Sequence, residues 1–195
     1  NSDGFVGHYG SSNFSCSISV IAGQGTTMQR DYDWTSRRHF EDLESPYKIA
    51  EEAARRTLKK MNPKKAATCQ VPVVYDPRVS QTLIGHLAGA INGAAIARGT
   101  SFLLEMMEQQ VFGNNINIID NPHVLRGPSS KPFDGEGVRN APLDIIKDGI
   151  LQNWLLDSAS GRQLNLASNG RASRGTSSPP SPSSSNLYMA PGNIS

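Results

Sequence analysis

The sequence predicts an α+β fold in which mixed and antiparallel sheets accompany one long, glycine-rich helix. Residues 14–22 alternate apolar and serine side chains with the period of two that a half-buried strand shows. Residues 77–98 instead repeat apolar side chains at helical spacing. Asp148-Gly149 separates two apolar runs and is typical of a β-hairpin turn. Together these signals favour helices combined with a largely antiparallel sheet.

Composition and charge exclude several classes of protein. The chain has 195 residues, of which 37% are hydrophobic, and this is enough to form a core. A net charge of +2 is too small to predict a nucleic-acid or membrane partner. The most apolar stretch, residues 83–97, is interrupted by His86 and Asn92 and is too short to span a bilayer. Cys16 and Cys69 belong to no metal-binding spacing, which favours free thiols and a cytoplasmic location.

The first third of the chain predicts a hairpin followed by a helix. After a glycine turn at residues 23–25, residues 26–33 can return as the second strand. Ser45-Pro46 supplies an N-cap and a first helical residue, and Asn62-Pro63 ends the helix.

Charged side chains on this helix are spaced for ion pairs. Glu51 and Arg55 lie four residues apart, as do Glu52 and Arg56. The lysines at the end of the helix could form a binding patch. No aromatic side chains interleave them, so the interpretation that they complement the helix dipole is simpler.

The centre of the chain predicts a buried strand at residues 71–75 that leads into the long helix Pro77–Arg98, which Gly99 ends. Gly85, Gly89 and Gly93 recur every fourth residue within this helix. A glycine in a helix interior costs roughly 1 kcal/mol relative to alanine. We therefore expect another helix or a ligand to pack closely on that face.

The remaining elements are predicted as follows. Residues 102–111 have the pattern of a second helix, and residues 116–120 that of a strand. A long connection, residues 121–142, precedes the hairpin. The tail, residues 167–195, is rich in serine, glycine and proline, so it is either a disordered linker or an irregular loop that feeds a short strand at residues 187–189.

No local catalytic set is present. The four histidines occur singly, without the spacing of a metal site, and a nucleophile elbow and a P-loop are both absent. His86 lies on the glycine-rich helix and is more typical of a hydrogen-bonded structural histidine than of a catalytic base. The chemistry alone therefore predicts an α+β domain without an assigned reaction.

Several ordered motifs nevertheless resemble one family. They are residues 98–103 (RGTSFL), 118–123 (IIDNPH), 132–138 (PFDGEGV), 146–151 (IKDGIL) and 186–192 (NLYMAPG). In this order they resemble the TldD/PmbA family, and most of all its PmbA branch, also called TldE. The resemblance implies a cytoplasmic protein of a metallopeptidase family, in which a TldD and a TldE subunit form a heterodimer that matures or degrades small or unfolded peptides. Members are also described as modulators of DNA gyrase.

The resemblance further implies that this chain is the non-catalytic subunit. The TldD branch carries an HExxxH zinc motif on the corresponding helix, and its three positions fall on Ile84, Gly85 and Gly89 here. None of these can bind zinc or transfer a proton. We therefore expect no catalytic residue, no metal and no cofactor in this chain, and zinc in a TldD-like partner subunit.

The resemblance implies a fragment of a two-domain protein. Residues 1–66 would be the C-terminal part of the family's N-terminal domain, and residues 67–195 the first part of its C-terminal domain. The loop around Arg171, Arg174, Gly175 and Thr176 is the candidate for a peptide cleft or a subunit interface.

Two other interpretations remain open. The chain could be part of a stand-alone peptide-binding or regulatory protein, monomeric or homodimeric, without hydrolytic activity. It could also be an independent metallopeptidase with scattered ligands such as His86 and His123, which a bound metal would reveal. No interpretation includes direct binding of nucleic acid or of a membrane.

Overall fold

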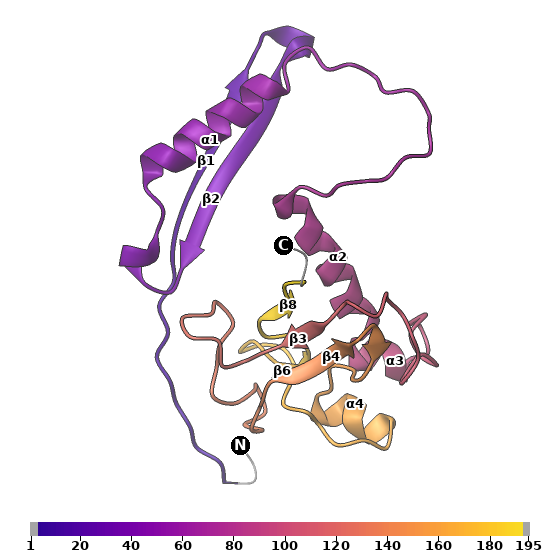
Figure 1. Cartoon of the computed structure of the whole chain (residues 1–195). Helices are drawn as coiled ribbons and strands as arrows, with labels where there is room; N and C mark the ends of the chain where they lie inside the picture. The colour runs from indigo at the N-terminus through magenta and orange to yellow at the C-terminus, as the bar shows by residue number, and fades with distance from the viewer. Residues whose placement is uncertain (1–3, 193–195) are drawn as a thin grey trace. The chain divides into compact units, whose positions relative to one another are not determined.

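A computed structural model describes residues 4–192 and divides the chain into two compact units (Figure 1). One unit is Gly10–Val74, and the other joins the residues up to Tyr9 with those from Tyr75 onward. Both contain helices and antiparallel strands, so the predicted α+β class is confirmed.

The unit Gly10–Val74 is a β-hairpin with one helix packed on it. Strand β1 (Phe14–Ala22) pairs antiparallel with β2 (Gln29–Arg37), and α1 (Pro46–Lys59) contacts both strands. Short 3₁₀ turns lie at Gly25–Thr27 and Phe40–Asp42. Because residues 25–27 form such a turn, the second strand begins later than predicted.

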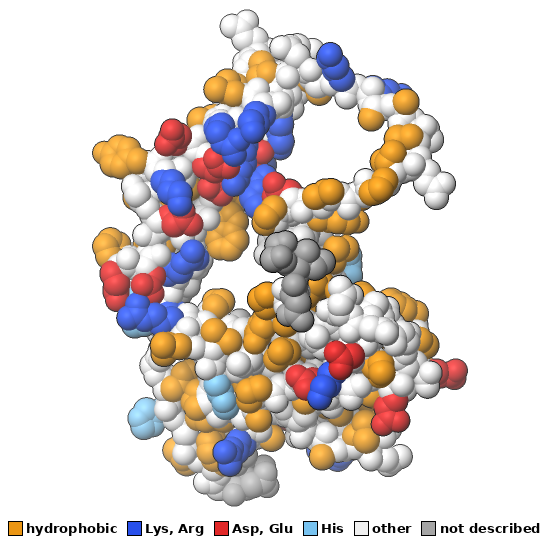
Figure 2. Space-filling model, viewed as in Figure 1, with side chains coloured by type: hydrophobic (Ala, Val, Ile, Leu, Met, Phe, Trp, Pro, Cys, Tyr) orange, Lys and Arg blue, Asp and Glu red, His pale blue; other side chains and the backbone are white. Residues whose placement is uncertain are grey.

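Ion pairs join α1 to the strand beneath it. Lys60 Nζ lies 3.0 Å from Asp31 on β2, and Arg56 Nη1 lies 2.9 Å from Asp33. Glu52 pairs with Arg56 and also with Arg55, and the hydrogen bond from Arg55 is the main cause that lowers the pKa of Glu52 to about 2. Figure 2 shows the resulting mixture of blue and red side chains on this unit.

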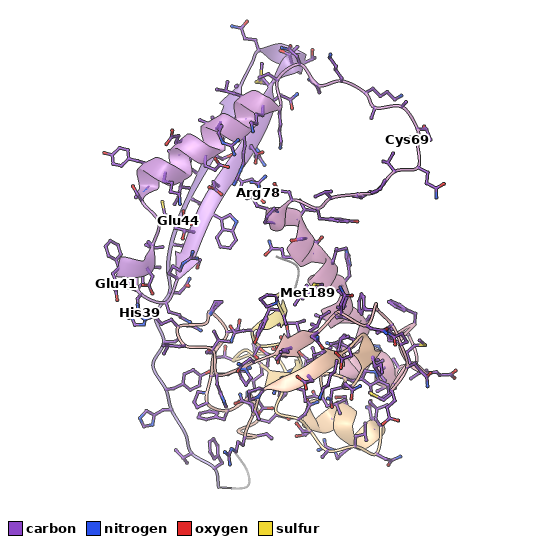
Figure 3. The ribbon with its side chains drawn as sticks, viewed as in Figure 1. His39, Glu41, Glu44, Cys69, Arg78 and Met189 are labelled. Atoms are coloured by element: carbon purple, nitrogen blue, oxygen red, sulfur yellow. The ribbon has the colours of Figure 1, made fainter. Side chains whose placement is uncertain are left out.

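Glu44 adds a further pair at the start of α1. It lies 2.8 Å from Lys48 one turn later and is labelled in Figure 3. The carboxylates of Asp31 and Asp33 on β2 thus pair with Lys60 and Arg56 at the end of α1. These ion pairs help to hold the helix on the hairpin in a unit with few buried apolar residues.

The strand predicted at residues 71–75 does not form. Val71, Val73 and Val74 are 61%, 69% and 94% exposed, and no strand among residues 4–192 pairs with them. Valine favours a strand only when a neighbouring strand accepts its backbone hydrogen bonds, and the described residues provide none here.

The glycine-rich helix is two helices rather than one. Helix α2 (Pro77–Ala90) ends before Asn92, and α3 (Gly93–Ala97) follows. The Asn92 side chain caps α3 by accepting a hydrogen bond from Ala94 N at 3.0 Å. Gly93 N donates to Leu155 O at 2.8 Å instead of continuing the helix. Gly99, with φ +70°, ends α3 as predicted.

The second unit is built on a four-stranded antiparallel sheet in the order β5-β4-β3-β8. These strands are β3 (Ile118–Asp120), β4 (Leu143–Lys147), β5 (Ile150–Leu151) and β8 (Leu187–Met189). Leu87 of α2 and Ile91, which directly follows this helix, pack with Ile118, Ile146 and Leu151 of the sheet to form the core.

Residues 102–111 form turns instead of the predicted helix. Glu108 N donates to Leu151 O, and Leu151 N donates to Gln109 O, at 2.8 and 3.0 Å. The backbone is therefore hydrogen-bonded to β5 and within local turns, such as Met106 N to Leu103 O at 3.2 Å, instead of along a helix. Leu103 still enters the core.

The Asp148-Gly149 hairpin is confirmed, and both residues have positive φ as this turn requires. Residues 167–192 of the tail adopt the second of its two predicted forms, because they contribute β6 (Ala172–Ser173), β7 (Ser181–Pro182) and β8, whereas residues 193–195 lie outside the described residues. Helix α4 (Ser158–Gln163) was not predicted, although the Asp157 capping box marks its start.

Candidate functional site

The candidate site is a groove of about 510 Å³ between α2 and β8, called the α2–β8 groove below. It is lined by Ser80, Gln81, Leu83, Ile84, Gly85, Ala88, Ser184, Ser185, Leu187, Tyr188 and Met189. None of these side chains is charged. Figure 3 labels Met189 at the end of β8 and Arg78 in the first turn of α2. The lining suits an uncharged segment of polypeptide rather than an ion.

The helical wall of the groove is positioned by the buried end of α2. The helix begins at Asp76, whose side chain accepts from Arg78 N at 2.9 Å. Leu87 and Ala90, near the other end, are buried in the core. Leu83 in the middle is 47% exposed, so the groove is lined by the part of α2 that projects from the core.

At two of the three glycines, no neighbouring group packs against the side of α2 among the described residues. A Cβ atom on Gly85 or Gly89 would meet nothing within 4 Å among the described residues. On Gly93 it would lie 2.6 Å from both Leu155 O and Ser160 Oγ. Close packing therefore occurs at Gly93, whereas a packing partner for Gly85 and Gly89 stays a prediction.

The strand wall is the outer edge of the sheet. Asn121 N donates to Asn186 O and Ala190 N donates to Asn117 O, so the even-numbered residues of this segment bond to β3. By the alternation of an antiparallel ladder, the backbone groups of Leu187 and Met189 point away from β3. No strand among residues 4–192 pairs with that edge.

A buried ionic cluster lies where β8 begins. Asp120, fully buried at the end of β3, accepts hydrogen bonds from Ser185 N at 2.7 Å and Ser185 Oγ at 2.9 Å. It also pairs with Arg171 Nε. Arg171 Nη2 donates to Ala141 O at 2.7 Å, and the side chain is 1% exposed. Arg171 thus contacts internal groups rather than facing the groove.

The other predicted cleft residues lie elsewhere. Arg174, Gly175 and Thr176 are exposed and are not among the described residues that line the α2–β8 groove. Arg174 packs its side chain near Gly135. A role for this loop in a cleft or an interface stays a prediction.

Lys131 lies close to the ionic cluster. Burial lowers the pKa of Lys131, although the carboxylates of Asp134 and Asp120 oppose this effect. Its Nζ donates to Ala172 O at 3.3 Å. Asp134 in turn accepts from Ala172 N at 3.0 Å, so Lys131 and Asp134 bind the two backbone groups of Ala172 at the start of β6.

The residues at the expected zinc positions do not fit a metal. Ile84, Gly85 and Gly89 carry no ligating atom. Across residues 4–192 no three side chains of His, Cys, Asp or Glu gather to hold an ion. His86 is exposed, and His123 Nε2 lies 2.9 Å from Asn140 Oδ1. No step of metal chemistry can be assigned to these residues.

The described helices are also short. None within residues 4–192 has the length and hydropathy needed to cross a bilayer.

The second unit is an α+β domain with an antiparallel sheet, an exposed sheet edge and a projecting helix, and comparison with known families assigns this domain to a class. Residues 68–195 match the model of the PmbA/TldA metallopeptidase C-terminal domain, and residues 1–61 match that of the central domain. The chain belongs to the PmbA/TldD family.

Curated relatives support the PmbA branch. The chain is 44% identical to the metalloprotease PmbA of Escherichia coli O157:H7 over 172 residues, and 40% identical to a PmbA homolog of Haemophilus influenzae. Each alignment covers 88% of this chain. The chain spans only 38% of the length of either relative.

Solved structures share the fold. A candidate modulator of DNA gyrase from Bacteroides thetaiotaomicron matches with a TM-score of 0.86 and 26% identity, over 98% of this chain and 41% of that one. TldE from Thermococcus kodakarensis matches with a TM-score of 0.75 and 16% identity, over 94% of this chain and 42% of that one. At that identity the second match concerns the fold alone.

Proposed function

We propose that this chain is part of a PmbA/TldE-like, non-catalytic subunit of a zinc-dependent peptidase. In this proposal a TldD-like partner subunit in the cytoplasm holds the zinc, and together the subunits mature or degrade small or unfolded peptides. The observation that carries the proposal is the uncharged α2–β8 groove, which has Ile84 and Gly85 where a catalytic subunit would carry its motif.

The chemistry of the groove supports binding rather than hydrolysis. A zinc peptidase needs imidazole ligands and a carboxylate that activates water. The groove offers instead the outward backbone groups of Leu187 and Met189. An extended peptide can add to such an edge by main-chain hydrogen bonds, which tolerate many side chains.

A second candidate function is a stand-alone peptide-binding or regulatory protein, monomeric or homodimeric. The similarity to a protein named as a candidate modulator of DNA gyrase favours it. The same groove would then retain a peptide without any cleavage.

The two functions can be separated with the full-length protein. Cleavage of an unstructured polypeptide would be measured with the protein alone, with its zinc-motif paralogue alone, and with both, each with and without a chelator. We expect cleavage to rise when both are present and to disappear with the chelator. Binding of the polypeptide without a rise in cleavage would support the regulatory function.

A substitution in the groove tests whether this site is involved. Gly85→Phe would fill the groove, because Gly85 lines it and an added Cβ atom would meet nothing within 4 Å among the described residues. Gly89→Phe is the matched control on the same helix, outside the lining residues. We expect only Gly85→Phe to lose cleavage. If both variants lose it equally, or if neither loses it, the groove is not the peptide-binding site.

A further inference from the structure

We propose that Asp120 and Arg171 are positioning residues that hold the strand wall of the α2–β8 groove through Ser185. The inference rests on the proposed function, since it treats the groove as a peptide site. It assigns to Arg171 an indirect role in that site, although its side chain does not line the groove.

Ser185 connects the ionic cluster to the groove. It lines the groove, and both its N–H and its hydroxyl donate to the carboxylate of Asp120. The strand β8 begins two residues later. The position of Asp120 therefore decides where the exposed edge of β8 starts.

Asp120 is in turn held by Arg171. Arg171 Nε pairs with its carboxylate, and Nη2 donates to Asp120 O at 3.1 Å. Nη1 donates to Asn169 O at 2.9 Å, and Nη2 also reaches Ala141 O. The planar guanidinium thus joins the end of β3 to two other segments, as only a forked donor can.

The opposite charges of Asp120 and Arg171 fix these two side chains beside each other. A buried carboxylate without its partner is strongly unfavourable, so Asp120 and Arg171 must stay together. Hydrogen bonds to a charged group are stronger than those between neutral groups. The two donors of Ser185 are therefore held firmly, and through them the first residues of the groove wall.

The ionic cluster fixes the position of β8, which is a short strand at the edge of the sheet. β8 has only three residues and pairs with β3 on one side, so few backbone hydrogen bonds fix it. A short edge strand of this kind frays unless an end is anchored. Ser185 supplies a charged anchor at its first end, beside the neutral hydrogen bond that the Asn186 side chain donates to Asn121 O at 2.7 Å.

The experiment compares two serine substitutions in the full-length protein. Ser185→Ala removes the hydroxyl that donates to Asp120. Ser183→Ala is the matched control, since within residues 4–192 the only hydrogen-bond partner of the Ser183 hydroxyl is Ser184 O, at 3.4 Å. Ser185→Thr keeps a hydroxyl and serves as the rescue variant. Hydrogen exchange would be measured on fragments that contain residues 186–190, with residues 149–152 as the internal reference.

We expect Ser185→Ala to accelerate exchange in residues 186–190 by about tenfold or more, the effect of losing a hydrogen bond to a charged group. Exchange in the reference fragment should stay unchanged, and both the control and the threonine variant should resemble the wild type. Equal exchange in the alanine variants, or acceleration in both fragments, would overturn the proposal.

Peptide binding gives the second readout. An uncharged, end-blocked peptide of alternating Val and Thr should bind Ser185→Ala about tenfold more weakly than Ser183→Ala. Equal affinity would overturn the positioning role. If the wild type binds no such peptide, the proposed function fails, whereas the exchange measurement still decides whether the cluster holds β8.

Discussion

The missing Cβ atom of Gly93 lets α3 approach the segment that precedes α4. A Cβ atom on Gly93 would lie only 2.6 Å from Leu155 O and from Ser160 Oγ. Gly89, one turn earlier, has open space in the same position among the described residues. Two glycines of one sequence pattern therefore differ in their physical roles.

This difference predicts opposite effects of the same substitution. Gly93→Ala should lower the free energy of unfolding by about 1–3 kcal/mol, the usual cost of overpacking. Gly89→Ala should raise it by up to ~1 kcal/mol, because alanine favours a helix. Urea denaturation followed by circular dichroism would measure both, and a loss of stability in Gly89→Ala would indicate a neighbour that the described residues do not include.

A second prediction at this scale concerns Glu52. Its pKa is lowered from 4.5 to about 2 in the folded chain, so its stabilising effect is present above pH 4.5 and is lost as the pH falls toward 2. Glu52→Gln should therefore melt at a lower temperature than the wild type at neutral pH, and at a similar temperature near pH 2. The difference should be small, because the pair lies at the surface and is screened by solvent.

Thermal melting at several pH values would check this expectation, with Glu51→Gln as the control. No ion pair to Glu51 is found within residues 4–192. A difference between wild type and Glu52→Gln that stays constant from neutral pH to pH 2 would contradict the assignment.

Single elements depend on a few capping interactions. Helix α4 has only six residues, and such a short helix is not stable in isolation. Asp157, buried at its N-cap, accepts hydrogen bonds from Ser160 N and Ser160 Oγ at 2.7 and 2.6 Å. This capping box fixes the first turn of α4, which packs beside α3.

Removing the cap should loosen α4. Asp157→Ala removes the acceptor of Ser160 N and leaves the Ser160 hydroxyl only the weaker contact to Asp157 O at 3.4 Å, so it should cost about 1–2 kcal/mol. Asp157→Asn keeps an oxygen acceptor and should cost less. Chemical denaturation would measure the two variants, and equal stability of Asp157→Ala and the wild type would show that the cap contributes nothing.

At the scale of the whole molecule, the chain consists of two compact units, and it passes from one to the other after Tyr9 and again at the end of a segment without regular structure. Residues 62–76 contain no helix or strand, and Lys64 and Lys65 within them are exposed. The assignment of residues 1–66 and 67–195 to two domains of a longer protein stays a prediction.

Limited proteolysis tests this organisation. Trypsin should cleave first after Lys64 or Lys65, since a protease needs an extended, accessible segment. Arg126 is also exposed, but its loop is held by Asn186, whose side chain bonds to Ser129 N, Ser130 Oγ and Asn121 O. Mass spectrometry would identify the first fragments. Cleavage after Arg126 before cleavage after Lys64 or Lys65 would contradict this prediction.

Some features of the fold could be predicted from neighbouring residues. The alternation along β1, the Ser45-Pro46 helix start and the Asp148-Gly149 turn each depend on a few adjacent positions, and each was predicted correctly. The residue types at Ile84, Gly85 and Gly89, which exclude metal ligation there, are also properties of the sequence alone.

Other features were decided by contacts between distant residues. Residues 102–111 bond to β5 instead of forming a helix, and residues 71–75 stay unpaired because no described strand lies beside them. Neither outcome can be derived from local spacing, since each depends on which backbone groups the tertiary fold brings together.

The sequence by itself determined the α+β class, the principal turns and helix starts, and the lack of a metal-binding set at the glycine-rich helix. Only the tertiary structure decided that Asp120, Arg171 and Ser185 meet, and that α2 and β8 enclose a groove. These residues lie up to 65 positions apart in the chain. Local preferences act over a few residues, whereas a site of this kind exists only after the sheet has placed its strands side by side.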